Sequence, residues 1–246
     1  PILTISMAKM NKLISLDRES QLARFGAGTP GPEIEAQLKA EGFTLGHFPQ
    51  SWELSTVGGW VASRSSGQQS LHYGRIEALF AGGSMETLKG TMDIPTIPAS
   101  SAGPDIREMV LGSEGRMGII TEVVVRVTPV PQAEQFQVAF FPSWDAGLTA
   151  ARELVQQRVA LSMVRLSNPL ETISLLHMGA GERNYCGSSA ERSRNLFEDP
   201  FRESCSKNYL GTTLLCFALL CFTSLRACNA QVHARILMNA HICTYM

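Results

Sequence analysis

Hydroxyl side chains and glycines gather in one window of the sequence, residues 46–74. Ser55 and Thr56 stand directly before residues 57–62, for which the pattern predicts a short helix. Serine and threonine suit this place because the hydroxyl accepts a hydrogen bond from a first-turn N–H group. The other first-turn N–H groups and the helix dipole favour an anion. The window predicts either an anion-binding helix start or an ordinary capped helix followed by a Ser-rich loop.

The same window continues with glycines and a polar turn. Gly58 and Gly59 carry no Cβ, so a ligand can approach the backbone closely there. Residues 63–67 offer hydroxyls, backbone N–H groups and the guanidinium of Arg64 to an oxygen-rich partner. These groups fit an anionic ligand, and they fit a plain turn equally well.

A second window, residues 104–121, has a similar composition. The spacing predicts a helix over 105–111, a glycine-bearing turn over 112–115 and a buried, β-branched strand over 117–127. Our hypothesis is that the two windows converge in the fold and line one long anionic ligand.

The spacing of apolar residues and the positions of glycine and proline also predict the elements that position the windows. Pro30 or Pro32 suits the first turn of a helix, which Gly42 ends. The other expected elements are a hairpin of 14–16 with 21–25, a strand over 76–81, a hairpin of 85–87 with 90–92, a strand over 136–141, a helix over 146–157 and a strand over 164–166. A strand pair, a helix and a return strand make an α+β unit.

Composition excludes several classes of protein. The 246 residues carry a net charge of −1 with no basic run, so nothing indicates a nucleic-acid partner. All six cysteines follow Tyr185 and none forms a CxxC pair, so we expect reduced thiols and no metal. The chain opens on Pro1 without a signal-peptide pattern, and we expect a fragment of a cytoplasmic protein.

An apolar, uncharged run occupies residues 209–225 near the C-terminus. It is at the short limit for a membrane span, which needs about 20 residues. Three interpretations stand: a buried helix or strand, a membrane anchor, or a tail encoded out of the register of the preceding chain.

Three blocks in order, GHFPQSWELSTVGGWVASRSSG, SLHYGRIEALF and GPDIREMVLGSEGRMGIITEVVVRVTPVP, resemble the flavin-binding region of the alkyldihydroxyacetonephosphate synthase family. That family lies within the vanillyl-alcohol oxidase superfamily, with its PCMH-type FAD-binding domain. The resemblance covers roughly residues 2–170. It implies an α+β fold: the second flavin subdomain, with a mixed or antiparallel sheet and flanking helices, over 1–131, the start of a cap domain over 132–180 and an atypical tail over 181–246.

The resemblance implies FAD as cofactor, contacted by three segments. Gln50 stands where the family usually has an acid, and Arg116 and Met117 replace smaller or aliphatic residues. The implied contact residues are Gln50, Ser51, Trp52, Glu53, Leu54, Ser55 and Thr56, then Ser63, Arg64, Ser65 and Ser66, and finally Glu114, Gly115, Arg116, Met117, Gly118, Ile119 and Ile120.

Two further residues match the family individually. His47 matches a histidine near flavin and substrate, where it would move a proton or bind a phosphate; the alternative is a structural histidine. Arg165 matches a cap arginine that would hold an anion or tie the cap to the flavin domain; the alternative is a surface salt bridge. The family's pyrophosphate loop would precede Ile2, and its catalytic tyrosine and His-rich loop would follow the end of this chain.

The implied function is ether-lipid-type alkyl transfer through a flavin adduct, on a small-molecule or lipid-precursor substrate. One alternative is an FAD-linked oxidase of a 2-hydroxy acid or other alcohol, as in bacterial relatives. Another is a flavin-binding module that is incomplete for catalysis. The resemblance also allows a homodimer and, as in eukaryotic relatives, a peroxisomal location. A membrane-associated protein would use residues 209–225.

Overall fold

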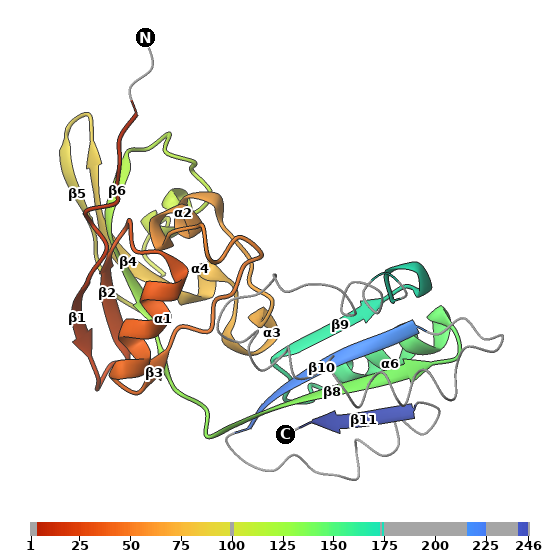
Figure 1. Ribbon diagram of the computed structural model, residues 1–246. Helices are drawn as coiled ribbons and strands as arrows, with labels where there is room; N and C mark the ends of the chain where they lie inside the picture. The colour runs from red at the N-terminus through yellow and green to blue at the C-terminus, as the bar shows by residue number, and fades with distance from the viewer. Residues whose placement is uncertain (1–3, 99–100, 173, 175–215, 225–240, 246) are drawn as a thin grey trace. The chain divides into compact units, whose positions relative to one another are not determined.

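The computed structural model describes residues 4–98, 101–172, 174, 216–224 and 241–245 (Figure 1). The chain divides into two compact units, Pro1–Val130 and Pro131–Met246. Both predicted windows lie in the first unit.

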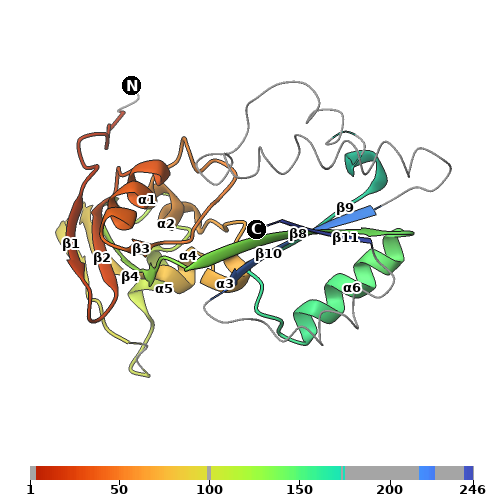
Figure 2. The ribbon, with the colours of Figure 1, turned by 60° about the horizontal axis from the view of Figure 1, so that its bottom comes forward.

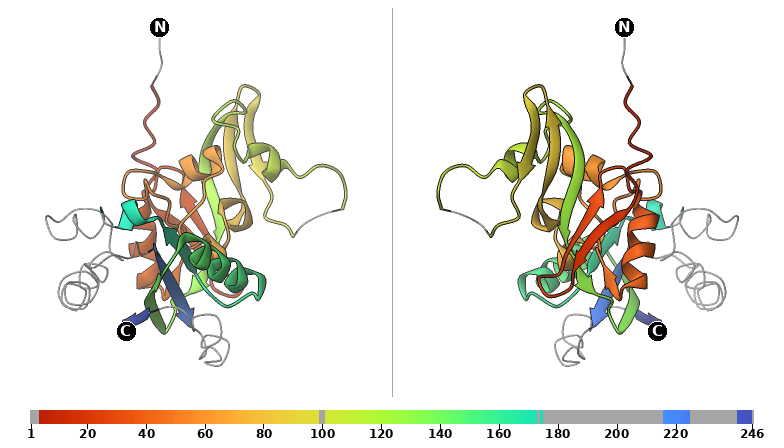
Figure 3. Two further views of the ribbon diagram at one scale, coloured as in Figure 1. Left: turned by 90° about the vertical axis from the view of Figure 1, so that its right-hand side faces the viewer. Right: turned by 90° about the vertical axis from the view of Figure 1, so that its left-hand side faces the viewer.

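The first unit is built on a five-stranded antiparallel sheet in the order β1-β2-β6-β4-β5. Strand β6 (Ile119–Arg126), from the second window, lies in the centre and pairs with both β2 and β4. Its consecutive valines at 123–125 are all buried, and since successive side chains point to opposite faces of the sheet, both faces of this strand are covered. Figure 3 shows β4, β5 and β6 side by side. The other strands are β1 (Leu13–Asp17), β2 (Leu22–Gly26), β4 (Phe80–Thr87) and β5 (Gly90–Ile94).

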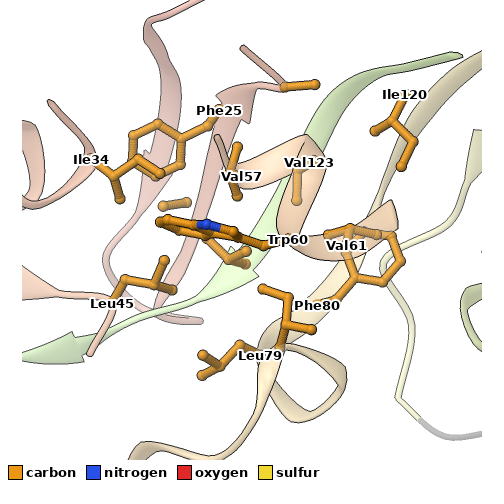
Figure 4. Close-up of a cluster of buried hydrophobic side chains, with 14 of the residues drawn as sticks. Phe25, Ile34, Leu45, Val57, Trp60, Val61, Leu79, Phe80, Ile120 and Val123 are labelled. Atoms are coloured by element: carbon orange, nitrogen blue, oxygen red, sulfur yellow. The ribbon is translucent and has the colours of Figure 1, made fainter. Parts of the chain in front are cut away.

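Helices α1 (Gly31–Ala40) and α2 (Val57–Ser63) pack against this sheet (Figure 2). Helix α1 begins at Gly31 with Pro32 in its first turn and ends before Gly42, as predicted. Trp60 of α2 lies at the centre of the core among side chains of β2, α1 and α2, as Figure 4 shows. The shorter elements are β3 (Phe43–Thr44), α3 (Ser70–Tyr73), α4 (Ile76–Leu79), α5 (Ile106–Val110) and β7 (Thr128–Pro129), and β3 pairs with β7.

The predicted strand over residues 76–81 is wrong in its first part. One helical turn, α4, occupies the stretch up to Leu79, and strand β4 begins at Phe80. Ile76 and Leu79 are both buried, and residues three apart share a face of a helix, whereas they would point to opposite faces of a strand. Burial of both side chains therefore selects the helical turn.

The second unit contains a four-stranded antiparallel sheet in the order β11-β8-β10-β9, with helix α6 (Trp144–Gln156) packed against it. Ser143 caps α6 by accepting a hydrogen bond from the Ala146 N–H at 3.2 Å. The small core includes Ala139, Phe141 and Leu154. The strands are β8 (Ala133–Phe141), β9 (Met163–Ser167), β10 (Cys216–Ser224) and β11 (His241–Tyr245).

Part of the apolar run at residues 209–225 forms strand β10. Its backbone lies between β8 and β9 with continuous antiparallel pairing. Within the described residues, no helix has both the length and the apolar character needed to cross a bilayer. The remainder of the run and the side chains of the six cysteines lie outside what the structure describes.

Candidate functional site

The two windows meet at helix α2. The backbone N–H of Gly112 donates to the Val61 carbonyl at 3.0 Å, and the N–H of Glu114 donates to the Ala62 carbonyl at 2.9 Å. The predicted convergence of the windows is therefore confirmed by direct hydrogen bonds. Their contact with a ligand stays a prediction.

The start of α2 differs from the expected anion site. The first two N–H groups donate to carbonyls of the preceding chain, Val57 to Thr29 at 3.0 Å and Gly58 to Ala27 at 2.9 Å. The Thr56 hydroxyl, as predicted, caps the helix, accepting from Gly59 N–H at 3.4 Å. The idea that α2 presents free N–H groups is wrong, because segments distant in sequence already use them.

The adjacent glycines have different functions. A Cβ on Gly58 would lie 2.8 Å from the Ala27 carbonyl oxygen, so this glycine allows α2 to pack closely on the end of β2. Gly59 is exposed, and a Cβ there would meet only the Thr56 hydroxyl at 3.4 Å. Of the pair, Gly59 alone is exposed, and its N–H donates to the Thr56 hydroxyl while its carbonyl accepts from the Ser63 hydroxyl at 2.8 Å.

The guanidinium of Arg64 is held by two carboxylates of the protein. Its backbone has a left-handed φ of 53°, and it ends α2. Its guanidinium donates to Glu77 at 2.8 Å and to Glu108 at 2.6 Å. The hydrogen bond to Glu77, followed by that to Glu108, raises the pKa of Arg64 above its ordinary value. The side chain of Arg64 therefore joins the segment 63–66 to α4 and α5 instead of offering a free cation.

His47 is buried, with 1% of its surface exposed. Its Nε2 lies 2.7 Å from Ser65 Oγ, and its ring meets the Trp60 ring edge-on at a centroid distance of 5.0 Å. Burial lowers its pKa to about 4, so the imidazole is neutral at pH 7. Its Nδ1 is buried and has no hydrogen-bond partner among the described residues. A neutral, enclosed ring is suited to orienting Ser65 and poorly suited to attracting a phosphate.

Trp60 connects His47 to the loop of residues 50–56. The Trp60 Nε1–H donates to Ser55 Oγ at 2.7 Å, and the Ser55 hydroxyl donates to the Ser51 carbonyl at 2.7 Å. Trp52 is a core residue packed against Gly31, whose Cβ would fall 2.5 Å from the Trp52 indole nitrogen. Gln50, Ser51, Glu53 and Leu54 are exposed.

The third predicted segment, residues 114–120, forms a turn that leads into β6. Gly115 has a φ of 79° and open space where a Cβ would be. Glu114 and Arg116 are exposed beside it. Gly118 is packed, since a Cβ would lie 2.3 Å from the Glu86 carbonyl oxygen, and Ile120 is a core residue.

Arg165 lies on β9 in the second unit and forms an ion pair with Glu171 of the same unit. Its side chain is about half exposed. The salt bridge that was one of its two predicted alternatives is present. An anion-binding function for Arg165 stays a prediction.

A hollow of about 140 Å³ lies away from all the predicted site residues. Arg107, which lines it, is held by Asp105 and by the Ile97 carbonyl. This hollow is smaller than a dinucleotide requires. It is lined by Ile94, Pro95, Ile97, Pro98 and residues 102–107.

The exposed groups of the two windows are of the kinds that can hydrogen-bond a dinucleotide. Gly59 and Gly115 expose backbone without a Cβ in the way. The exposed Ser66 hydroxyl has no partner among the described residues. The Gly115 backbone and the Ser66 hydroxyl can hydrogen-bond sugar, phosphate and ring oxygens.

Sequence reasoning missed one buried acid behind this site. Glu35 of α1 is 3% exposed and binds the segment that leads to His47. A signal was present, because Glu35 follows Gly31 by four residues and precedes Leu38 by three, on the buried face of α1.

Comparisons with known proteins agree with the fold. The FAD binding domain family matches residues 1–92. Alkyldihydroxyacetonephosphate synthase of Dictyostelium discoideum is 40% identical over 69% of this chain, and that of Caenorhabditis elegans is 38% identical over 67%. The matched region is 28% of the length of either relative.

Solved structures and other flavoproteins also match. A crystal structure of an alkyldihydroxyacetonephosphate synthase superposes with a TM-score of 0.77 at 31% identity, covering 96% of this chain and 42% of that one. A protein of Escherichia coli named as an uncharacterized FAD-linked oxidoreductase is 36% identical over 64% of this chain and 33% of its own length.

Proposed function

The chain carries an FAD binding domain that resembles that of the alkyldihydroxyacetonephosphate synthases, and from this premise we propose that its two windows hold FAD for an ether-forming alkyl transfer. In that reaction a long-chain alcohol replaces the acyl group of the substrate, and no net oxidation occurs. The observation that carries the proposal is the direct hydrogen bonding of the second window, at Gly112 and Glu114, to helix α2 of the first window.

We assign the binding of FAD to backbone and hydroxyl groups. The exposed backbone at Gly115 and the hydroxyl of Ser66 are the available donors and acceptors, and Gly59, which has no Cβ, allows FAD to approach α2 closely. Arg64 keeps the segment 63–66 beside α5 through Glu108. FAD, when bound, supplies the redox-active ring on which the exchange depends.

His47 holds its neighbours in place in this proposal. Its Nε2 is hydrogen-bonded to Ser65 and its ring packs on Trp60, which binds Ser55, so one buried imidazole positions two of the three cofactor-contact segments. Because burial lowers the pKa of His47 to about 4, its imidazole is a weak base toward a bound group at pH 7.

A second candidate is oxidation of a 2-hydroxy acid or another alcohol by FAD. The Escherichia coli relative named as an FAD-linked oxidoreductase favours it. A third candidate is a module that binds FAD without turnover, and the activity assays below distinguish it from the other two.

FAD titration of the purified chain, followed by its visible absorbance, tests the site. We expect a bound-flavin spectrum that Ser66→Ala and Gly115→Ala both weaken. Gly42→Ala is the matched control, because Gly42 has a φ of 82° and equally open surroundings but lies at the end of α1. Equal loss of binding in the Gly42 and Gly115 variants would contradict the assignment.

Activity assays then separate the three candidates. Alkyl transfer predicts ether product from an acyl-dihydroxyacetone phosphate and a long-chain alcohol, with no reduction of an added dye. Oxidation predicts dye reduction with a 2-hydroxy acid. Bound flavin with neither product identifies the module.

A further inference from the structure

The carboxylate of Glu35 binds three consecutive residues of the chain. One oxygen accepts hydrogen bonds from the backbone N–H groups of Leu45 at 3.0 Å and Gly46 at 3.2 Å. The other accepts from the Thr44 hydroxyl at 2.8 Å. All three donors are neutral. The first of them, Thr44, is the last residue of β3, which lies beside α1 (Figure 1).

An aromatic ring also contacts the last residue of this segment. Gly46 has a φ of 71°, and a Cβ on it would lie 2.2 Å from Cγ of Tyr73. The ring of Tyr73 therefore packs directly on the Gly46 backbone. We call residues 44–46 the clamped segment: all three bind the Glu35 carboxylate, and Gly46 also contacts this ring.

The residue after the clamped segment is His47. Its Nε2 contacts Ser65 of the segment 63–66, and its ring contacts Trp60, which binds Ser55 of the loop 50–56. The direction in which the chain leaves Gly46 thus determines where His47 meets Ser65 and Trp60, and through Trp60 the loop 50–56.

Burying a carboxylate is costly, and an apolar side chain at this place on α1 would avoid that cost. Burial raises the pKa of Glu35, and the hydrogen bonds from Thr44 and Gly46 lower it in part. Directional hydrogen bonds fix the orientation of a loop in a way that apolar contacts do not. These hydrogen bonds suit Glu35 to holding the clamped segment in one conformation.

We propose that Glu35 is a positioning residue for the flavin site, which acts by holding residues 44–46 so that His47 stays buried against Ser65 and Trp60. This inference rests on the proposed function, since it assigns Glu35 to the same FAD site. It extends that function to a residue that does not contact the cofactor.

Two readouts test the proposal, one of them independent of FAD. The first is the NMR titration of the His47 imidazole, assigned by its absence in His47→Gln. The second is the dissociation constant of FAD. We expect Glu35→Ala to move the pKa of His47 from about 4 toward its ordinary 6.5 and to weaken FAD binding about tenfold or more.

Glu35→Gln is the conservative variant. Its amide oxygen can accept from Leu45 and Gly46, and its NH₂ group can donate to the Thr44 hydroxyl. We expect the His47 titration to stay low and FAD affinity to stay within about threefold of the parent chain. Glu33→Ala is the matched control, because it removes an exposed carboxylate from the same helix, and it should change neither readout.

A folded Glu35→Ala chain with an unchanged His47 titration overturns the inference. If Glu35→Ala does not fold, Thr44→Val decides, because it removes one donor and keeps the shape: an upward shift of the His47 pKa supports the inference, and no shift overturns it. If even the parent chain binds no FAD, the proposed function fails. The His47 titration alone then tests whether Glu35 positions His47.

Discussion

Arg64 and Glu108 form an ion pair at 2.6 Å across 44 residues of sequence, and this pair joins the two windows that FAD is proposed to bridge. The same guanidinium binds Glu77 of α4. Arg64 therefore connects three separate elements, and it does so from a left-handed backbone conformation that glycine would adopt more readily.

Substitution of Arg64 separates the effects of its charge and its backbone. Arg64→Ala removes both ion pairs and keeps the strain of a left-handed residue, whereas Arg64→Gly removes the ion pairs and relieves the strain. Guanidinium denaturation should therefore give a higher midpoint for Arg64→Gly than for Arg64→Ala. A lower midpoint for the glycine variant would contradict the conformation assigned to this residue.

The stability of the chain should depend on pH through His47. Its pKa is lowered on folding to about 4, so the unfolded chain binds a proton between pH 6.5 and about 4 that the folded chain does not. The stabilisation is complete above pH 6.5, falls through that window and levels off below about pH 4. From pH 7 to pH 5 the parent chain should lose about 2 kcal/mol more than His47→Gln, as measured by denaturation at both pH values. Equal losses would show that His47 is not buried in its neutral form.

Alanine substitution of the neighbouring glycines in α2 should have opposite effects. Gly58→Ala should lower the free energy of unfolding by about 1–3 kcal/mol, because its Cβ would overlap Ala27. Gly59→Ala should raise it by roughly 0.5–1 kcal/mol, because the position is exposed and alanine favours helix. If FAD approaches the Gly59 backbone, the stabilised variant will bind FAD more weakly. Thermal unfolding with and without FAD measures both effects.

Trp60 and Ser55 should be energetically coupled. Trp60→Phe removes the Nε1–H that donates to Ser55 Oγ, and Ser55→Ala removes the acceptor. A double-mutant cycle by chemical denaturation should give a coupling energy of about 1 kcal/mol. Additive effects would mean that the loop 50–56 is held by other contacts.

Local signals in the sequence predicted much of the first unit. Proline in the first turn of α1 and Thr56 before α2 act within a few residues, and both helices begin where these residues place them. The stretch from Ile76 was assigned wrongly because one helical turn and a short strand present similar apolar composition. Only the surrounding core decides between them.

The candidate site was less predictable, because its key contacts join distant parts of the chain. Thr29 and Ala27 use the N–H groups that the pattern left free for an anion. Glu35 was missed since its donors lie 9–11 residues away, beyond the end of its own helix. Assignment of FAD contacts to individual residues of the three segments stays a prediction.

The central place of β6 has a consequence for the order in which the first unit assembles. The hairpins β1–β2 and β4–β5 can each form as soon as they leave the ribosome, but the edges of β2 and β4 that later pair with β6 are then unpaired. Only the arrival of Ile119–Arg126 covers both edges at once. Nascent chains that stall before this strand should therefore expose the unpaired edges of β2 and β4, which are prone to aggregation, and should depend on chaperones until translation continues.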